Sequence, residues 1–133
     1  MIKLYVDGGC FGNSQKDLSK RKMIWVVIDK DKKVFIEEES DGGSNNIAEF
    51  LAIKTAIKYC VEHEIKNVTI YSDSNCAISW YNNKIKGKNL NDKDRVLEIK
   101  KEIKSLVNYF DTIKIKLIPR EKNLAGIYIE NKK

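Results

Sequence analysis

The chain has 133 residues, of which 42% are hydrophobic and 33% charged, with a single proline. This composition is typical of a folded globular protein and excludes disordered and fibrous chains, and no apolar run approaches the ~20 residues that span a bilayer. The formal net charge of +6 favours a polyanionic partner, although solubility alone explains the charge equally well.

We therefore expect a single domain over residues 1–133 that acts as a monomer and has no membrane partner. No secretion signal opens the chain, so a cytoplasmic location is expected. The three cysteines are an odd number at wide spacing, which fits neither a disulfide framework nor a zinc site. We expect them to be reduced.

The first third of the chain predicts three strands. Residues 1–6 carry apolar side chains at alternate positions and end at Asp7-Gly8-Gly9, so we expect Asp7 at the carboxyl end of this strand. After a polar connection, the pattern predicts a hairpin that pairs antiparallel with the first strand. The hairpin comprises strands at 23–28 and 33–38 and a turn at 29–32.

Apolar residues at helical spacing follow the turn-forming segment 41–46. Ser44 or Asn45 is a natural N-cap for this helix. The next strand, at 66–72, is followed by Asp73 just as the first strand is followed by Asp7. The remaining predicted elements are a helix at 74–81, a helix at 92–107, a strand at 112–117 and a helix at 123–130.

This order of elements predicts an α/β fold with a five-stranded mixed sheet flanked by helices. Active sites in such folds lie at the carboxyl ends of adjacent strands, which singles out Asp7 and Asp73. Glu49 is a third candidate, because it stands in the first turn of its helix among apolar neighbours. Three carboxylates together indicate a Mg²⁺ site. Taken singly, the aspartates also fit turn formers and the glutamate also fits a helix N-terminus.

Four motifs, in this order and spacing, resemble type 1 ribonuclease H over nearly the whole chain. They are YVDGGCFGN at 5–13, SNNIAE at 44–49, YSDS at 71–74 and IPREKN at 118–123. The resemblance implies a ribonuclease H-like fold and an endonuclease that hydrolyses the RNA strand of RNA–DNA hybrids, leaving 5′-phosphate and 3′-hydroxyl ends. It also implies two ions, Mg²⁺ or Mn²⁺, with Asp7 bridging both and with Glu49 and Asp73 each completing one coordination sphere.

The same resemblance predicts hybrid-binding residues beside the metal site. In the family, small polar side chains and backbone groups at this place sense the 2′-hydroxyls of one strand and the deoxyribose of the other. The corresponding residues are Cys10, Asn13, Asn45 and Asn46, while Ser44 matches a position that helps hold a DNA-strand phosphate and Gly8 is a further expected substrate-binding residue. Helix capping and a turn are the alternative explanation for the two adjacent asparagines.

One position departs from the family pattern. Relatives usually carry a fourth acid four residues after the position of Asn123, where this chain has Ile127. Glu130, one helical turn later on nearly the same face, is our candidate to replace it as catalytic residue and metal ligand. The alternatives are a solvated helix end at Glu130, a site that runs on three carboxylates, and a hybrid-binding module that has lost catalysis. A nuclease of a larger assembly and a relative that acts on DNA also stay open.

Three further expectations concern the periphery. The single histidine, His63, is expected on the surface, and Trp80 is expected in the core. The residues after the helix at 74–81 are basic, and we expect them to contact nucleic-acid phosphates. They are Lys84, Lys86 and Lys88.

Overall fold

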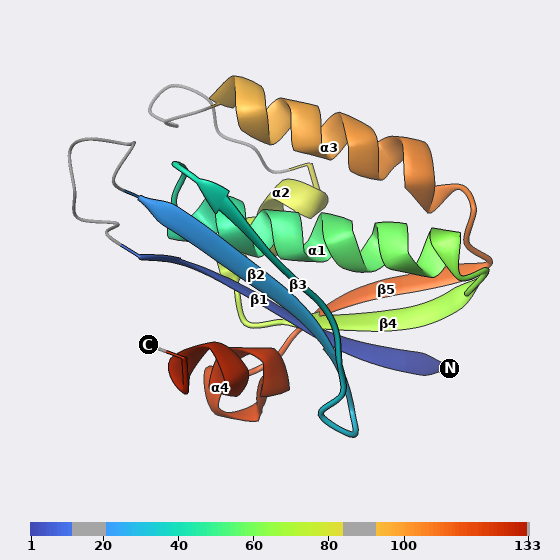
Figure 1. Ribbon diagram of the computed structural model, residues 1–133. Coiled ribbons are helices and arrows are strands. Elements are labelled where there is room, and N and C mark those ends of the chain that lie inside the picture. Colours follow the sequence, from blue (N-terminus) through green and yellow to red (C-terminus); the bar gives the residue numbers. More distant parts are fainter. Residues whose placement is uncertain (12–20, 84–92, 133) are drawn as a thin grey trace.

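The computed structural model describes residues 1–11, 21–83 and 93–132 (Figure 1). In chain order the elements are β1 (Ile2–Phe11), β2 (Lys22–Asp29), β3 (Val34–Asp41), α1 (Asn45–Glu62), β4 (Asn67–Ser72), α2 (Asn75–Tyr81), α3 (Lys93–Val107), β5 (Thr112–Leu117), the 3₁₀ helix η2 (Arg120–Lys122) and α4 (Leu124–Glu130). Most predicted elements are confirmed to within one or two residues, and the largest differences are at the carboxyl ends of β1 and β3. The predicted contacts of Asn13, Lys84, Lys86 and Lys88 lie outside the described residues.

The five strands form one mixed sheet in the order β3-β2-β1-β4-β5. β1, β2 and β3 pair antiparallel, whereas β4 pairs parallel with both β1 and β5. Helices α1, α2 and α3 lie on one side of the sheet and α4 covers the other side at β1 and β2 (Figure 1). The predicted α/β architecture and the antiparallel hairpin are therefore confirmed.

β2 contributes to the core on both faces of the sheet. Met23, Trp25 and Val27 pack in the larger core that includes α1, and Val26 and Ile28 pack in the smaller core that includes α4. Full burial of one such side chain contributes about 1.5–3 kcal/mol to stability. Alternation along a single strand thus fixes α1 and α4 on opposite faces of the sheet, next to β1.

β1 continues beyond its predicted end, so the expectation that the strand stops at Asp7 is wrong. It remains paired with β2 as far as Phe11, with Asp7 opposite Val26. Its parallel pairing with β4, however, stops at Tyr5. Asp7 reaches the carboxyl edge of the parallel strands because β4 separates from β1 there, not because β1 ends.

Gly8 shows why a glycine pair here belongs to a strand rather than a turn. A Cβ atom on Gly8 would lie 2.3 Å from the carbonyl carbon of Ala48 and 2.6 Å from the backbone nitrogen of Glu49. Real side chains do not tolerate such contacts, so only glycine allows the backbone of α1 to approach β1 this closely. The close approach places Glu49 beside the strand that carries Asp7.

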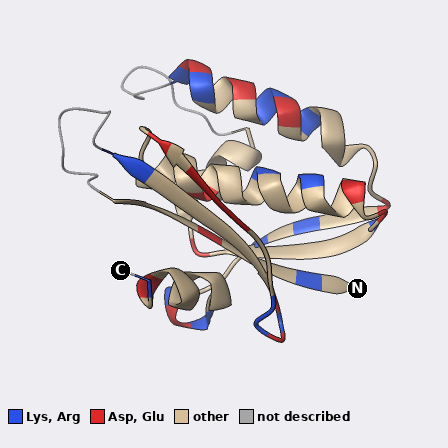
Figure 2. Ribbon diagram, viewed as in Figure 1, with Lys and Arg blue, Asp and Glu red and all other residues tan. Residues whose placement is uncertain are grey.

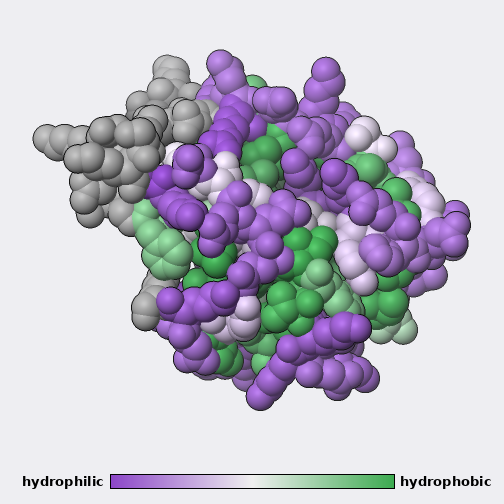
Figure 3. All heavy atoms as spheres, in the orientation of Figure 1, coloured by the Kyte–Doolittle hydropathy of each residue, from purple (hydrophilic) through white to green (hydrophobic). Residues whose placement is uncertain are grey.

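The predictions for the periphery hold in the described residues. Trp80 is 5% exposed and contacts the edge of Phe50, whereas His63 lies on the surface. All three cysteines are free, and burial raises the pKa of the Cys60 thiol to about 11. The outer surface of α3 carries both signs of charge (Figure 2), and apolar residues show on this side of the molecule as separate patches among hydrophilic ones (Figure 3). Among the described helices, none has the length and apolar character needed to cross a membrane.

The contact at Gly8 gives a stability prediction. We expect Gly8→Ala to lower the free energy of unfolding by about 1–3 kcal/mol, the usual cost of overpacking a core. Gly9→Ala is the matched control, because its Cβ would meet only Ile129 Cγ2 at 3.8 Å. Urea denaturation of both variants measures the difference. Equal changes at the two neighbouring glycines would contradict the proposed role of Gly8.

Candidate active site

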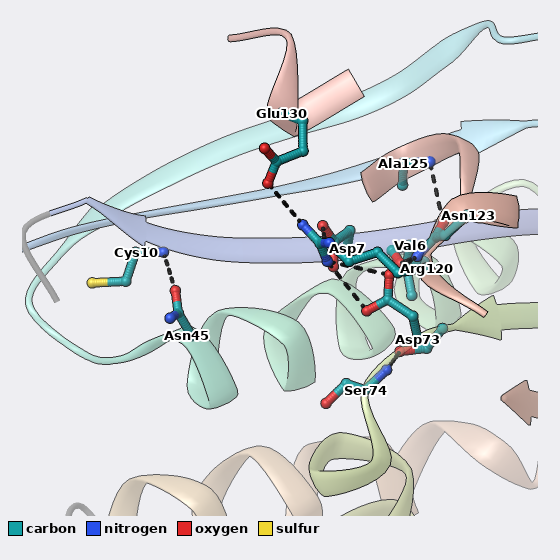
Figure 4. Close-up of polar contacts among 11 residues, drawn as sticks. Val6, Asp7, Cys10, Asn45, Asp73, Ser74, Arg120, Asn123, Ala125 and Glu130 are labelled. Atoms are coloured by element: carbon teal, nitrogen blue, oxygen red, sulfur yellow. Dashed lines mark hydrogen bonds and ion pairs between the residues drawn. The ribbon is translucent and has the colours of Figure 1, made fainter. Parts of the chain in front are cut away.

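Three carboxylates from three different elements meet at the edge of the sheet, and Figure 4 labels two of them, Asp7 and Asp73. Asp7 comes from β1, Glu49 from α1, and Asp73 directly follows β4. One carboxylate oxygen from each residue lies within 4.8 Å of the other two. The structure thus brings together the three acids that the sequence singled out.

Asp7 is the most deeply buried of the three, with 2% of its surface exposed. Its Oδ2 atom is buried and has no hydrogen-bond partner within the described part of the chain. Desolvation by burial, together with the charges of Asp73 and Glu49, raises the pKa of Asp7 to about 7, although Arg120 acts in the opposite direction. The ionised carboxylate therefore needs a cation beside it at neutral pH.

Glu49 is half-buried and is the fifth residue of α1. It therefore lies just beyond the first turn, and the expected stabilisation by the helix dipole does not account for its position. Burial is the largest effect on its carboxyl group and raises the pKa, the charge of Asp73 adds to this, and a hydrogen bond from Ser74 lowers it. Glu49 is held at the site by the packing of α1 on Gly8 and by Ser74.

Asn123 fixes the geometry around Asp73. Its side chain is fully buried, and its Nδ2 donates to the Val6 carbonyl at 2.9 Å and to Asp73 Oδ2 at 3.1 Å. Its Oδ1 accepts from the Ala125 N–H at 3.1 Å and so caps α4. One asparagine therefore ties together β1, the residue after β4 and the start of α4 (Figure 4).

Arg120, on η2, reaches into the acidic cluster. Its Nη1 lies 3.3 Å from Asp73 Oδ2 and 3.5 Å from Asp7 Oδ2, while its Nη2 lies 3.2 Å from Glu130 Oε1. The side chain is 48% exposed, so it approaches the carboxylates from the solvent side. The next two residues of η2, Glu121 and Lys122, are exposed and form no ion pair with these acids among the described residues.

The position at which the family resemblance predicts a fourth acid is occupied by Ile127. Ile127 is 46% exposed, whereas its neighbour Gly126 packs against the cluster, where a Cβ on it would lie 3.3 Å from Asp73 Oδ2 and 3.5 Å from Asp7 Oδ2. Among the described acids, Glu130 is outside the group whose oxygens approach within 4.8 Å, and it is linked to that group through Arg120. A role for Glu130 in catalysis or metal binding stays a prediction.

The residues expected to contact a hybrid lie around the start of α1. Asn45 Oδ1 accepts from the Cys10 N–H at 2.7 Å, which joins the beginning of α1 to the end of β1. Ser44 caps α1 by accepting from a backbone N–H at 3.3 Å, so its predicted capping role is confirmed. Asn45 and Asn46 are exposed, whereas Gly8 and Cys10 are buried. Their contacts with a nucleic acid stay a prediction.

The three carboxylates fit a hard divalent cation. They supply only oxygen donors, the ligands that Mg²⁺ and Mn²⁺ prefer. The buried Asp7 Oδ2 accepts no hydrogen bond from the described residues, and the positive group beside it, Arg120 Nη1 at 3.5 Å, reaches it from the solvent side. The cluster can therefore hold a metal ion, with Asp7, Glu49 and Asp73 as ligands.

Asn123 and Gly126 contribute to the site but were not predicted as site residues. For Asn123 the local signal was its position just before the last helix, which indicates an N-cap but does not reveal the contact with Asp73. For Gly126 no local signal exists, because its meaning depends on two carboxylates that are distant in the sequence.

Comparisons with known proteins agree with this geometry. The sequence matches a family model described as reverse transcriptase-like over residues 6–129. No curated protein sequence matches the chain.

Solved structures show the same fold. The N-terminal RNase H domain of a Mycobacterium tuberculosis protein aligns with a TM-score of 0.71 at 20% identity, over 96% of this chain and 93% of that one. RNase H1 from Halobacterium salinarum aligns with a TM-score of 0.69 at 19% identity, over 98% of both chains. LC11-RNase H1, solved in complex with an RNA/DNA hybrid, aligns with a TM-score of 0.61 at 22% identity, over 92% and 88%. Because the family model spans most of the sequence, the chain belongs to the reverse transcriptase-like family, and its neighbours show that it has the ribonuclease H-like fold.

Proposed function

We propose that the protein is a Mg²⁺- or Mn²⁺-dependent endonuclease that hydrolyses the RNA strand of RNA–DNA hybrids and leaves 5′-phosphate and 3′-hydroxyl ends. The observation that carries the proposal is the cluster of Asp7, Glu49 and Asp73, which includes a buried carboxylate oxygen that has no hydrogen bond from the described residues. Further support comes from structural neighbours that are RNase H1 proteins, one of them bound to an RNA/DNA hybrid.

The residues divide the work of binding and positioning. Asp7 is the most deeply buried of the three acids, and a carboxylate oxygen of Glu49 and one of Asp73 lie within 4.8 Å of it. Asn123 holds Asp73 in place. Divalent cations bound to these oxygens supply the activation of the attacking water and the stabilisation of charge on the phosphate. Because β1 and α1 fix the backbones of Asp7 and Glu49, and Asn123 holds Asp73, the three carboxylates are positioned in advance for this role.

The exposed asparagines at the start of α1 are proposed to read the hybrid. Asn45 already binds the backbone of Cys10, which holds this surface rigid next to the acidic cluster. Amide groups both donate and accept hydrogen bonds, so they suit a ribose 2′-hydroxyl on one strand and base edges in the minor groove. The net positive charge of the chain adds attraction for phosphates that does not depend on sequence.

A cleavage assay tests the proposal. We expect the purified protein to cut the labelled RNA strand of a hybrid in Mg²⁺ or Mn²⁺, and Asp7→Asn to reduce the rate more than about 100-fold, since loss of even an outer partner of a metal ligand costs about 10–100-fold. Asp111→Asn, which alters an exposed aspartate away from the cluster, should cleave at the wild-type rate. Equal cleavage by wild type and Asp7→Asn, or none by either, would refute the enzymatic proposal.

The raised pKa of Asp7 gives a pH-dependent stability prediction. The folded-state pKa of about 7 exceeds the ordinary aspartate pKa of 3.8, so the folded protein binds the extra proton and loses stability as the pH rises through this window. In EDTA, Asp7→Asn removes this loss and should raise the free energy of unfolding by about 2–4 kcal/mol at pH ~8, with little gain near pH ~4. Urea denaturation across this range, with Asp111→Asn as control, makes the measurement. A difference that does not change with pH would contradict the assigned burial of Asp7.

A second candidate function is a hybrid-binding module that has lost catalysis, and Ile127 at the usual place of an acid is the observation that favours it. Because Ile127 is 46% exposed, Ile127→Asp introduces a carboxylate without disturbing the core. For an active nuclease, we expect this substitution to change the cleavage rate less than about tenfold, a difference of about 1.4 kcal/mol in the barrier. A rise from no measurable cleavage to efficient cleavage, with unchanged hybrid affinity, would instead establish the binding module.

A further inference from the structure

Arg120 places a positive charge where a metal ion has to bind. A single atom, Nη1, lies within 3.5 Å of both Asp7 Oδ2 and Asp73 Oδ2. These two oxygens belong to the carboxylates that form the proposed metal site. A Mg²⁺ ion requires metal–oxygen distances of about 2.0–2.1 Å. An ion bound to both oxygens would therefore compete with the guanidinium nitrogen for the same space, and the two positive charges would repel each other.

The partners of the acidic cluster differ in how easily they can leave. Asn123 is fully buried and bonded to three groups, so it is a fixed part of the site. Arg120 is 48% exposed, lies on a three-residue 3₁₀ helix, and forms one wall of an open depression of about 360 Å³ beside Asp73. Its side chain can swing towards solvent without opening either core.

Arg120 also holds the candidate fourth acid. Its Nη2 lies 3.2 Å from Glu130 Oε1 while Nη1 contacts the other two carboxylates. One guanidinium therefore bridges three acids, and its departure would break its contacts with Glu130, Asp7 and Asp73 together. The close-up in Figure 4 shows Arg120 lying between Glu130 and the two aspartates.

We propose that Arg120 is a built-in competitor for the metal ions, a cation that neutralises the acidic cluster in the metal-free protein and has to be displaced when a divalent cation binds. This inference rests on the proposed function, because it takes Asp7 and Asp73 as metal ligands. In this role Arg120 has two opposite effects, because its charge stabilises the metal-free fold and weakens the affinity of the site for metal ions.

Isothermal titration calorimetry of Mn²⁺ into the metal-free full chain tests the proposal. Arg120→Met, which removes the charge and keeps an extended side chain, is expected to bind Mn²⁺ about tenfold more tightly than wild type. Lys122→Met removes the same charge from the same short helix, and within the described part of the chain Lys122 takes part in no ion pair, so its affinity should stay within about twofold. Arg120→Lys retains the charge but not the two-pronged guanidinium, so an intermediate affinity is expected.

Thermal unfolding supplies the second measurement. In EDTA, Arg120→Met should melt at a lower temperature than Lys122→Met, and Mn²⁺ should raise its melting temperature by more. Mn²⁺ binding that is detected for Arg120→Met but not for the wild type or the other variants would also support the proposal. Equal affinities of Arg120→Met and Lys122→Met, or weaker binding by Arg120→Met, would overturn the role of Arg120 and leave the metal site intact. Absence of Mn²⁺ binding in wild type and all variants would overturn the metal site itself.

Discussion

The burial of one carboxylate beside two others is the constraint on which the site depends. Asp7 lies within the sheet at 2% exposure, next to Glu49 and Asp73, and its Oδ2 has no hydrogen-bond donor in the described residues. Like charges in a desolvated place oppose folding unless a cation balances them. A fold selected for stability alone would place an apolar side chain here, so this arrangement indicates a site kept for its chemistry.

The close approach of α1 to β1 places a second carboxylate beside the buried Asp7. Without a side chain on Gly8, the backbone at Ala48 and Glu49 comes against the strand, and Glu49 is brought to Asp7. On the other side, Asn123 connects Val6 with Asp73. The positions of Glu49 and Asp73 therefore depend on a small residue and an amide that bind no metal themselves, which is how a rigid scaffold fixes the geometry of metal ligands.

The sequence predicted the parts of this site that have a local signal. Asp73 follows a short alternating strand, and Ser44 caps a periodic helix, so both could be placed from neighbouring residues alone. The end of β1 could not, because Gly8 and Gly9 have the composition of a turn and their role in the strand depends on α1 packing against it. The contacts of Arg120 could not be predicted either, since a half-exposed arginine in a loop has many possible partners and its contacts are set by tertiary structure.

The balance of charge predicts that the lack of a fourth acid weakens binding of the second expected ion more than binding of the first. Three carboxylates exceed the charge of one divalent cation but fall short of the charge of two. A first ion therefore gains from displacing Arg120, because the cluster stays close to neutral. A second ion would make the site net positive unless Glu130 or a substrate phosphate joins it. In the proposed nuclease, Ile127 at the place of an acid would couple binding of a second ion to binding of the nucleic acid, because a substrate phosphate would then have to supply the charge that a fourth carboxylate would otherwise give.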